Sequence, residues 1–110
     1  METDMAAALQ DLHARICKAI ADPKRLMIIN ELRGGPLSVG EICHALGLTQ
    51  SNASQHLAIL RERGIVSATR AGTSVYYQLR SQKVVMAVDL LREFLADELA
   101  EQGRLSGAFE

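Results

Sequence analysis

The chain has 110 residues, of which 48% are hydrophobic and 23% charged, and it carries a net charge of −1. These values are typical of one folded domain with a modest core, so they exclude a large multidomain enzyme and a disordered chain. No apolar run is long enough to span a bilayer, the N-terminal residues are acidic where a secretion signal is basic, and two cysteines are too few for a disulfide scaffold. We therefore expect a cytoplasmic protein from a reducing compartment.

The first part of the chain has the pattern of two helices. An amphipathic helix is predicted over residues 5–19, because apolar side chains recur there at steps of four, three and four residues. A second helix is predicted to begin at Asp22, a good N-cap, followed by Pro23, which suits the first helical position. The Gly-Gly-Pro sequence of residues 34–36 ends it. The apolar residues of the first helix are Met5, Leu9, Leu12 and Ile16.

A helix-turn-helix is predicted next. A short helix over residues 39–46 starts with capping-box spacing, a serine followed three residues later by a glutamate. After a glycine turn, Thr49 is expected to cap a second helix that ends at Gly64. Two short helices joined by about three to four residues that include glycine form the outline of this motif. The inward positions of the second helix are Ala53, Leu57 and Leu60.

After Gly64 the hydrophobic period changes from 3.6 to 2. Residues 65–69 and 74–79 are predicted to be strands of a hairpin, with residues 70–73 as the turn. Ser81 is expected to cap a last amphipathic helix that ends at Gly103. The sequence thus predicts a mainly helical fold with one small β-hairpin. The apolar residues of the last helix are Val84, Val88, Leu91 and Leu95.

The second helix of the motif begins with short side chains that form hydrogen bonds. Amides and hydroxyls read base edges in the major groove, and Gln or Asn pairs bidentately with adenine. A recognition helix makes its base contacts through its N-terminal residues. The residues expected to contact DNA from this helix are Thr49, Gln50, Ser51, Asn52, Ser54, Gln55 and His56.

Positive charge is concentrated in the middle of the chain. Residues 49–80 carry four arginines against one glutamate, whereas the segments on either side are net negative, so a polyanion would be directed to the middle. The predicted hairpin tip offers Arg70 and Thr73 to phosphate or the minor groove. Tyr76 and Tyr77 alternate faces, so one is expected in the core, and we assign Tyr77 to DNA. The arginines are Arg61, Arg63, Arg70 and Arg80.

Three stretches, AIADPKRL (19–26), LGLTQSNASQHL (46–57) and LRERGIV (60–66), resemble the ArsR/SmtB winged-helix repressors. RAGTSVYY (70–77) resembles their wing, and the resemblance covers roughly residues 10–100. It implies a winged helix-turn-helix of order α-α-α-α-β-β-α. It also implies a homodimer built on the first and last helices, a dyad-symmetric operator and release by an inducer. We expect this domain over residues 1–102 and a flexible tail over residues 103–110.

The metal sites of that family are not retained. Its soft-metal sensors resemble one another in a Cys-x-Cys that aligns here with Ser38 and Gly40, neither of which offers a thiolate. Its zinc site on the last helix aligns with four positions here, and only Asp97 among them has a side chain that binds zinc. These four positions are Ser81, Lys83, Phe94 and Asp97.

Cys17 and Cys43 leave three interpretations open. Both lie near apolar helix sides, which favours packing, since a buried cysteine behaves as a small apolar residue. In the second interpretation, oxidation or persulfidation couples them as a thiol switch. Relatives that sense reactive sulfur use positions on the second and last helices that hold no cysteine here. The third is a metal site in which His13 and Cys17, one helical turn apart, are joined by Cys43 and His44 across a dimer.

We therefore expect a homodimeric, sequence-specific transcriptional repressor whose partners are double-stranded DNA and a second copy, with no membrane and no cofactor. The inducer is expected to be a thiol-reactive signal, either an oxidant or reactive sulfur. One alternative is a metal-responsive repressor with a non-standard Cys/His site. Another is a winged-helix protein-interaction module without DNA binding. An enzyme is not expected, because no acid motif or glycine-rich phosphate loop accompanies the cysteine and histidine residues.

Overall fold

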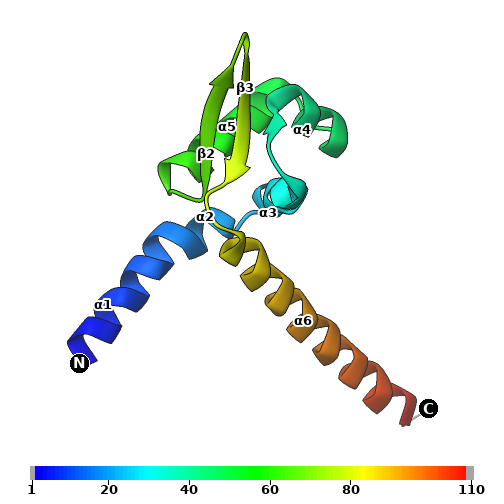
Figure 1. Cartoon of the computed structure of the whole chain (residues 1–110). Helices are drawn as coiled ribbons and strands as arrows, with labels where there is room; N and C mark the ends of the chain where they lie inside the picture. Colours follow the sequence, from blue (N-terminus) through cyan, green and yellow to red (C-terminus); the bar gives the residue numbers. More distant parts are fainter. Residues whose placement is uncertain (1, 109–110) are drawn as a thin grey trace.

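The computed structural model describes residues 2–108. Two long helices, α1 (Glu2–Leu12) and α6 (Gln82–Ala108), diverge from a body that holds the other elements, and a hairpin extends from that body on the side away from both termini (Figure 1). The predicted mainly helical fold with a small hairpin is confirmed. Within the described residues, no helix combines the length and hydropathy that a membrane span requires.

The first predicted helix is interrupted. After α1 comes a π-helical turn, η1 (His13–Cys17), and then α2 (Lys18–Ile20). A π turn widens the helix by about one residue per turn, so the apolar side changes direction along the helix. Ala19, which follows this turn, is buried in the core, whereas Met5 and Leu9 lie on α1, which diverges from the body, and are exposed.

The second helix, α3 (Pro23–Glu31), begins where the sequence predicts. The Asp22 carboxylate accepts hydrogen bonds from the backbone N–H groups of Lys24, at 2.8 Å, and Arg25, at 3.2 Å. A short 3₁₀ turn, η2 (Leu32–Gly34), follows it. This segment supplies the centre of the core through Ile28, Ile29 and Leu32.

The helix-turn-helix is formed by α4 (Val39–Leu46) and α5 (Gln50–Glu62). The predicted capping box is present: the Ser38 hydroxyl accepts from the Glu41 N–H at 3.1 Å, and the Glu41 carboxylate accepts from the Ser38 N–H at 3.0 Å. Gly47 ends α4 at a φ of +66°, in the left-handed region that favours glycine. The Thr49 hydroxyl then caps α5 by accepting from the Asn52 N–H at 3.1 Å. The motif is confirmed down to its caps.

The sheet differs from the prediction in two ways. Strands β2 (Val66–Ala71) and β3 (Ser74–Leu79) form the hairpin, but β1 (Leu37–Ser38) pairs with β3 to give the order β1-β3-β2. Two residues are too few to show an alternating pattern, which is why the sequence did not reveal β1. The turn is also shorter than predicted, because Arg70 pairs with Val75 inside the ladder.

The core lies between the helical layer and one face of the sheet. The last helix reaches it only with its first turns, where Val85 and Val88 are buried. The prediction that this helix ends at Gly103 is wrong, since α6 continues to Ala108. A glycine inside a helix costs only about 1 kcal/mol, which its helix-forming neighbours offset. The predicted tail over residues 103–110 lies in part outside the described residues. The other fully buried large side chains include Ile42, Leu57, Leu60, Ile65 and Val66.

Candidate nucleic-acid interface

Helix α5 presents a polar side because its other side is completely buried. Ala53, Leu57 and Leu60 each have 0% exposure, as the sequence predicts for the inward positions. This anchoring fixes which residues of the first two turns face outward. The exposed ones are Gln50, Ser51, Ser54 and Gln55, with Thr49 exposed at the cap, while Asn52 and His56 are half-buried.

Asn52 differs from its neighbours on α5. Its Oδ1 is buried and has no hydrogen-bond partner among the residues that the structure describes. A buried acceptor of this kind is normally satisfied by protein or ordered water. The amide of Asn52 is thus directed partly into the protein, and it offers less to an external ligand than Gln50 or Gln55 does.

The hairpin places its basic residue near the tip. Arg70 is exposed in β2, one residue before Ala71, which pairs with Ser74 across the turn. Gly72 has a φ of +64°, which the tight turn requires, and Thr73 is exposed beside it. The predicted pair Arg70 and Thr73 therefore lies at the end of the hairpin that is furthest from the body (Figure 1).

The two tyrosines of β3 lie on opposite faces of the sheet, as their alternation predicts, but the one that packs inward is Tyr77. Tyr77 packs against the hydrophobic core, between Leu37 of β1 and Ala68 of β2 in the ladder. Tyr76 lies on the other face, where it lines a shallow hollow on the sheet. The prediction that Tyr77 contacts DNA conflicts with this packing, and Tyr76 is the outward ring.

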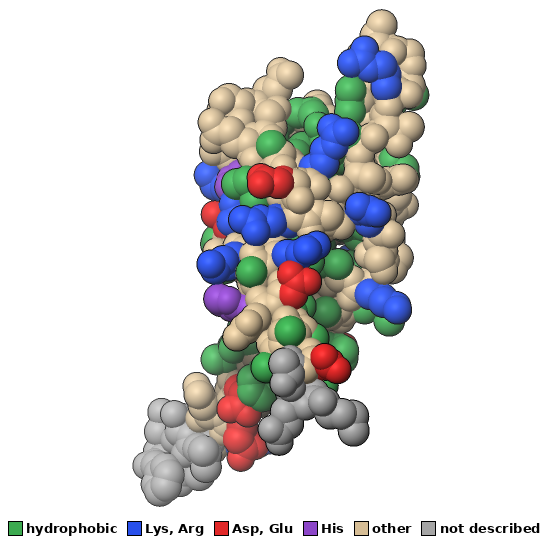
Figure 2. All heavy atoms as spheres, turned by 90° about the vertical axis from the view of Figure 1, so that its left-hand side faces the viewer, with side chains coloured by type: hydrophobic (Ala, Val, Ile, Leu, Met, Phe, Trp, Pro, Cys, Tyr) green, Lys and Arg blue, Asp and Glu red, His purple; other side chains and the backbone are tan. Residues whose placement is uncertain are grey.

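Basic side chains gather along one face of the molecule, from the hairpin to the base of α1 (Figure 2). At the base of the hairpin a hollow is lined by four arginines and by Glu62 and Gly64. Three of these arginines belong to the basic segment that the sequence identified, and Arg15 joins them from the N-terminal helix. The four are Arg15, Arg61, Arg63 and Arg80.

The predicted DNA residue His56 has a partner that the sequence did not indicate. Its Nδ1 lies 3.3 Å from Nη1 of Arg25, which is 31 residues away at the start of α3. The same guanidinium donates through Nε to the Ala19 carbonyl at the end of the N-terminal helix. Since Arg25 and His56 belong to segments far apart in the sequence, only the fold brings them together.

The two cysteines differ in accessibility. Both are free thiols; Cys17 is exposed and Cys43 is half-buried. Within the protomer, Cys17 does not pack against the core, although it lies in the π-helical turn next to the half-buried Ile16. Packing remains consistent with the half-buried position of Cys43.

The third interpretation of the cysteines, a metal site, is not assembled within one protomer. In the part of the chain that the structure describes, no three His, Cys, Asp or Glu side chains are arranged to hold a metal ion. The positions that align with the family's metal sites have other roles: Ser38 caps α4, and Phe94 is an exposed apolar residue of α6. The predicted candidates were His13, Cys17, Cys43 and His44.

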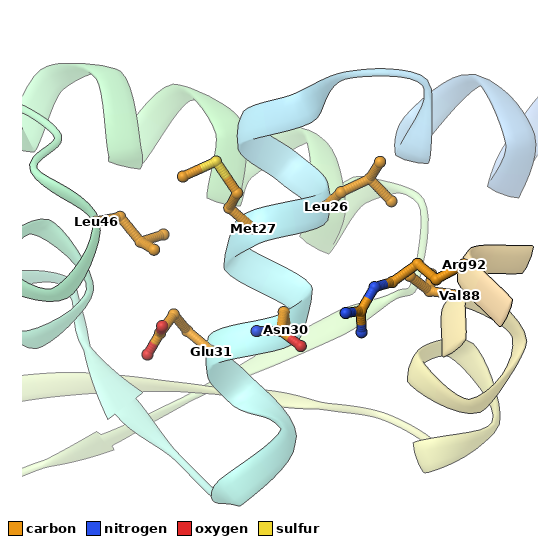
Figure 3. Close-up of a pocket in the computed structure, with 7 residues that line it drawn as sticks. All are labelled: Leu26, Met27, Asn30, Glu31, Leu46, Val88 and Arg92. Carbon is orange, nitrogen blue, oxygen red and sulfur yellow. The ribbon is translucent and has the colours of Figure 1, made fainter. Parts of the chain in front are cut away.

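A groove runs over α3, between Leu46 of α4 on one side and Val88 and Arg92 of α6 on the other (Figure 3). It has apolar walls, and in the close-up the Arg92 guanidinium points from α6 toward Asn30 of α3. Next to it, Arg33 and Asp89 form an ion pair that ties the end of α3 to α6. The groove is lined by Leu26, Met27, Asn30, Glu31, Leu46, Val88 and Arg92.

The two diverging helices carry exposed apolar side chains along their length. Such a concentration is unusual for a monomer surface and marks an interaction site. Of the residues predicted from spacing, Met5, Leu9, Leu12, Leu91 and Leu95 are exposed, whereas Val88 is buried and Ile16 and Val84 pack against the core. The exposed large apolar residues of the two helices are Met5, Leu9 and Leu12 on α1 and Met86, Leu90, Leu91, Phe94, Leu95 and Leu99 on α6.

Comparison with known proteins adds the family context. A sequence model described as "Bacterial regulatory protein, arsR family" matches residues 22–68. The transcriptional activator HlyU of Vibrio cholerae is 42% identical over 76 residues, which cover 69% of this chain and 70% of that protein. Among the first curated relatives that match, the chain spans from 44% to 72% of the relative's own length.

Two solved structures show the same arrangement of elements. The homodimeric winged helix-turn-helix DNA-binding domain of Mb0332 from Mycobacterium bovis superposes with a TM-score of 0.74 at 37% identity, covering 90% of this chain and 91% of that one. The transcriptional repressor BigR from Xylella fastidiosa gives a TM-score of 0.74 at 33% identity, covering 86% and 95%. The described fold is thus that of winged helix-turn-helix regulators.

Proposed function

Because the chain belongs to the ArsR family of bacterial regulatory proteins, we propose that it is a homodimeric, sequence-specific transcriptional repressor. The observation that carries this proposal is the anchoring of α5, whose buried side holds a row of amides and hydroxyls outward at its N-terminal end. Side chains of this type at this end of the second helix are what major-groove reading requires.

The proposed contacts are of two kinds: some read DNA base edges, and others bind phosphates and position the protein on the DNA. Gln50, Ser51, Ser54 and Gln55 read base edges, and His56 lies behind them on the same helix. Thr49, at the cap, lies at the positive end of the helix dipole, where a phosphate is stabilised. The remaining members of the predicted set, Asn52 and Tyr77, are directed toward the protein and are left out.

The hairpin acts as the wing. Arg70 and Thr73 lie at its exposed end, where an arginine reaches phosphate or the minor groove next to the site read by α5. Such contacts raise affinity for all sequences and fix the orientation of the domain, but they carry little sequence information.

A second copy covers the exposed apolar side chains of α1 and α6. The homodimeric state of the similar Mb0332 domain supports this assignment. In a twofold dimer the two α5 helices would enter successive major grooves about 34–36 Å apart, which matches an operator with dyad symmetry. A dimer on such a site excludes polymerase sterically.

An inducer releases the repressor by changing the spacing of the two α5 helices. The exposure of the Cys17 thiol favours a thiol-reactive signal, since access is one requirement for oxidation or persulfidation. The half-buried Cys43 would act as the resolving thiol once the helices move.

The experiment is a fluorescence-anisotropy titration of the reduced protein with DNA from upstream of its own gene. A scrambled duplex of the same length and composition is the control, and the salt concentration is varied. Tighter binding to the upstream DNA supports the repressor. Failure to bind either duplex at low salt would favour the protein-interaction module.

The same titration with polysulfide-treated protein tests the inducer. Loss of binding that is absent in Cys17→Ser supports the thiol switch. Unchanged binding after treatment would show that neither cysteine senses the signal. The inducer would then be a metal or a small organic molecule.

A further inference from the structure

Arg25 connects three elements of the fold. Its backbone lies in the first turn of α3, where its N–H donates to the Asp22 carboxylate at 3.2 Å. Its guanidinium donates backward to the last carbonyls of the N-terminal helix, from Nε to Ala19 and from Nη2 to Lys18 at 3.5 Å. The remaining nitrogen, Nη1, lies 3.3 Å from Nδ1 of His56 on α5.

The chemistry of this contact restricts His56. A guanidinium has donors only, so Nδ1 of His56 must accept the hydrogen bond with its lone pair. The imidazole in this contact is therefore neutral and carries its proton on Nε2. Arg25 thus selects one tautomer of His56 and holds one orientation of its ring.

The contact also joins two parts of the molecule that have different tasks. The carbonyls that Arg25 holds end the N-terminal helix, whose exposed apolar side is the proposed dimer surface. His56 lies on α5, the proposed reading helix. A second arginine makes a parallel connection: Arg63, at the C-terminal end of α5, donates to the Ala14 carbonyl at 2.9 Å. The N-terminal helix is therefore connected to α5 at two points, directly through Arg63 and indirectly through Arg25 of α3.

We propose that Arg25 is a positioning residue for DNA binding. Through His56 it sets the orientation of α5 relative to the N-terminal helix, and it turns the Nε2–H of His56 into a fixed donor for an acceptor on DNA. This proposal rests on the function proposed above. It assigns Arg25 no contact with DNA, and its effect on DNA affinity passes through His56.

The first test is the tautomer of His56, which NMR measures through the ¹⁵N chemical shifts of its two ring nitrogens. The unaltered protein is expected to show an unprotonated Nδ1 and a protonated Nε2. In Arg25→Lys this preference is expected to weaken, because an ammonium that bonds the carbonyls of α2 has no planar fork with which to reach the ring as well. A tautomer that is the same in both proteins would overturn the proposal.

The second test is a double-mutant cycle on operator affinity. Arg25→Lys is expected to weaken operator binding about tenfold, the size expected for loss of a hydrogen bond from a charged donor. In a His56→Ala background the same change is expected to weaken binding less than about twofold, because the path from Arg25 to DNA has already been removed. Equal losses in both backgrounds would overturn the proposal.

Controls separate positioning from simple stability. Arg25→Lys keeps a cation at the α2 carbonyls, so thermal unfolding and sedimentation should show a folded protein with its normal oligomeric state. Arg104→Lys is the matched control, because Arg104 lies on α6, away from α3 and α5, and forms an exposed ion pair with Glu101. If Arg104→Lys weakens operator binding as much as Arg25→Lys does, Arg25 has no special role.

The two proposals fail in different ways. If the unmodified protein binds no duplex, the proposed function falls, and the NMR measurement alone decides whether Arg25 sets the tautomer of His56. If the protein binds its operator but the two changes are additive, the function stands and the positioning role of Arg25 falls.

Discussion

Arg33 and Asp89 form a two-point ion pair between segments 56 residues apart. Nη2 of Arg33 donates to Oδ1 of Asp89 at 2.8 Å and Nη1 donates to Oδ2 at 3.1 Å, a bidentate geometry. Arg33 follows α3 and Asp89 lies on α6, so the pair holds the last helix against the body. Arg33 is itself oriented by Asn30, whose Oδ1 accepts from it at 2.7 and 3.0 Å.

This ion pair predicts a pH dependence of stability. The hydrogen bonds from Arg33 hold the pKa of Asp89 below its ordinary value of 3.8. A carboxylate whose pKa is lower in the folded state than in the unfolded state stabilises the folded protein. This contribution is complete above the pKa of the unfolded state and is lost as the pH falls through the pKa of the folded state. Asp89→Asn is therefore expected to lower the Tm by a few degrees at neutral pH, and the difference should shrink below a pH of about 4.

Thermal unfolding followed by circular dichroism between acid and neutral pH measures this effect. Asp11→Asn is the control, since Asp11 forms an exposed pair with Arg15 inside one helix and holds no two elements together. A Tm difference for Asp89→Asn that stays constant into strong acid would contradict the assignment.

Sequence preference is expected to depend on Gln55. Gln55→Ala should reduce discrimination at one base pair of each half-site by about 1–3 kcal/mol, because a side-chain amide pairs specifically with a base edge. Ser54→Ala should relax discrimination in the same way, by a smaller amount. Binding to a panel of single-base operator variants measures this change.

The matched control for Gln55→Ala is Gln102→Ala, which removes an exposed amide from α6 rather than α5. It should leave the ranking of the operator variants unchanged. If Gln55→Ala weakens binding to every operator variant equally, Gln55 contacts the DNA backbone and not a base.

The wing is expected to act through charge. Arg70→Ala should weaken binding to all duplexes about equally and lower the slope of log affinity against log salt by roughly 1, since one phosphate contact is lost. Arg104→Ala is the control, because this arginine pairs with Glu101 on α6, far along the chain from the wing. A change in base preference with an unchanged salt slope would show that the wing reads sequence.

The exposed apolar side of α6 is expected to form the dimer. Phe94→Glu places a charge among side chains that a second copy would bury, so it should dissociate the dimer and weaken operator binding at least about tenfold. Phe94 is 62% exposed in the protomer, so the change should leave the fold of the monomer intact. Sedimentation velocity and anisotropy measure the two effects.

Glu98→Gln on the same helix is the control for Phe94→Glu, since it alters an exposed polar residue. If Phe94→Glu sediments as the unaltered protein does, the second copy is not held at this part of α6.

The sequence by itself determined the helix caps and the helix-turn-helix of this protein. The caps at Asp22, at Ser38 with Glu41, and at Thr49 form between residues two or three apart, so their geometry follows from the residue types in order. The inward side of α5 follows from its period, and a polar side must then face outward. For this reason the helix-turn-helix and its candidate reading residues could be predicted without the structure.

The tertiary structure decided what depends on residues far apart in the chain. The contacts of Arg25 with His56 and of Arg33 with Asp89 join partners 31 and 56 residues apart, and no local pattern encodes such pairs. Which tyrosine packs inward, and whether Cys17 is covered, depend on which distant elements pack next to them. Periodicity reports which side of an element is apolar, whereas packing against distant elements decides which of its residues is covered.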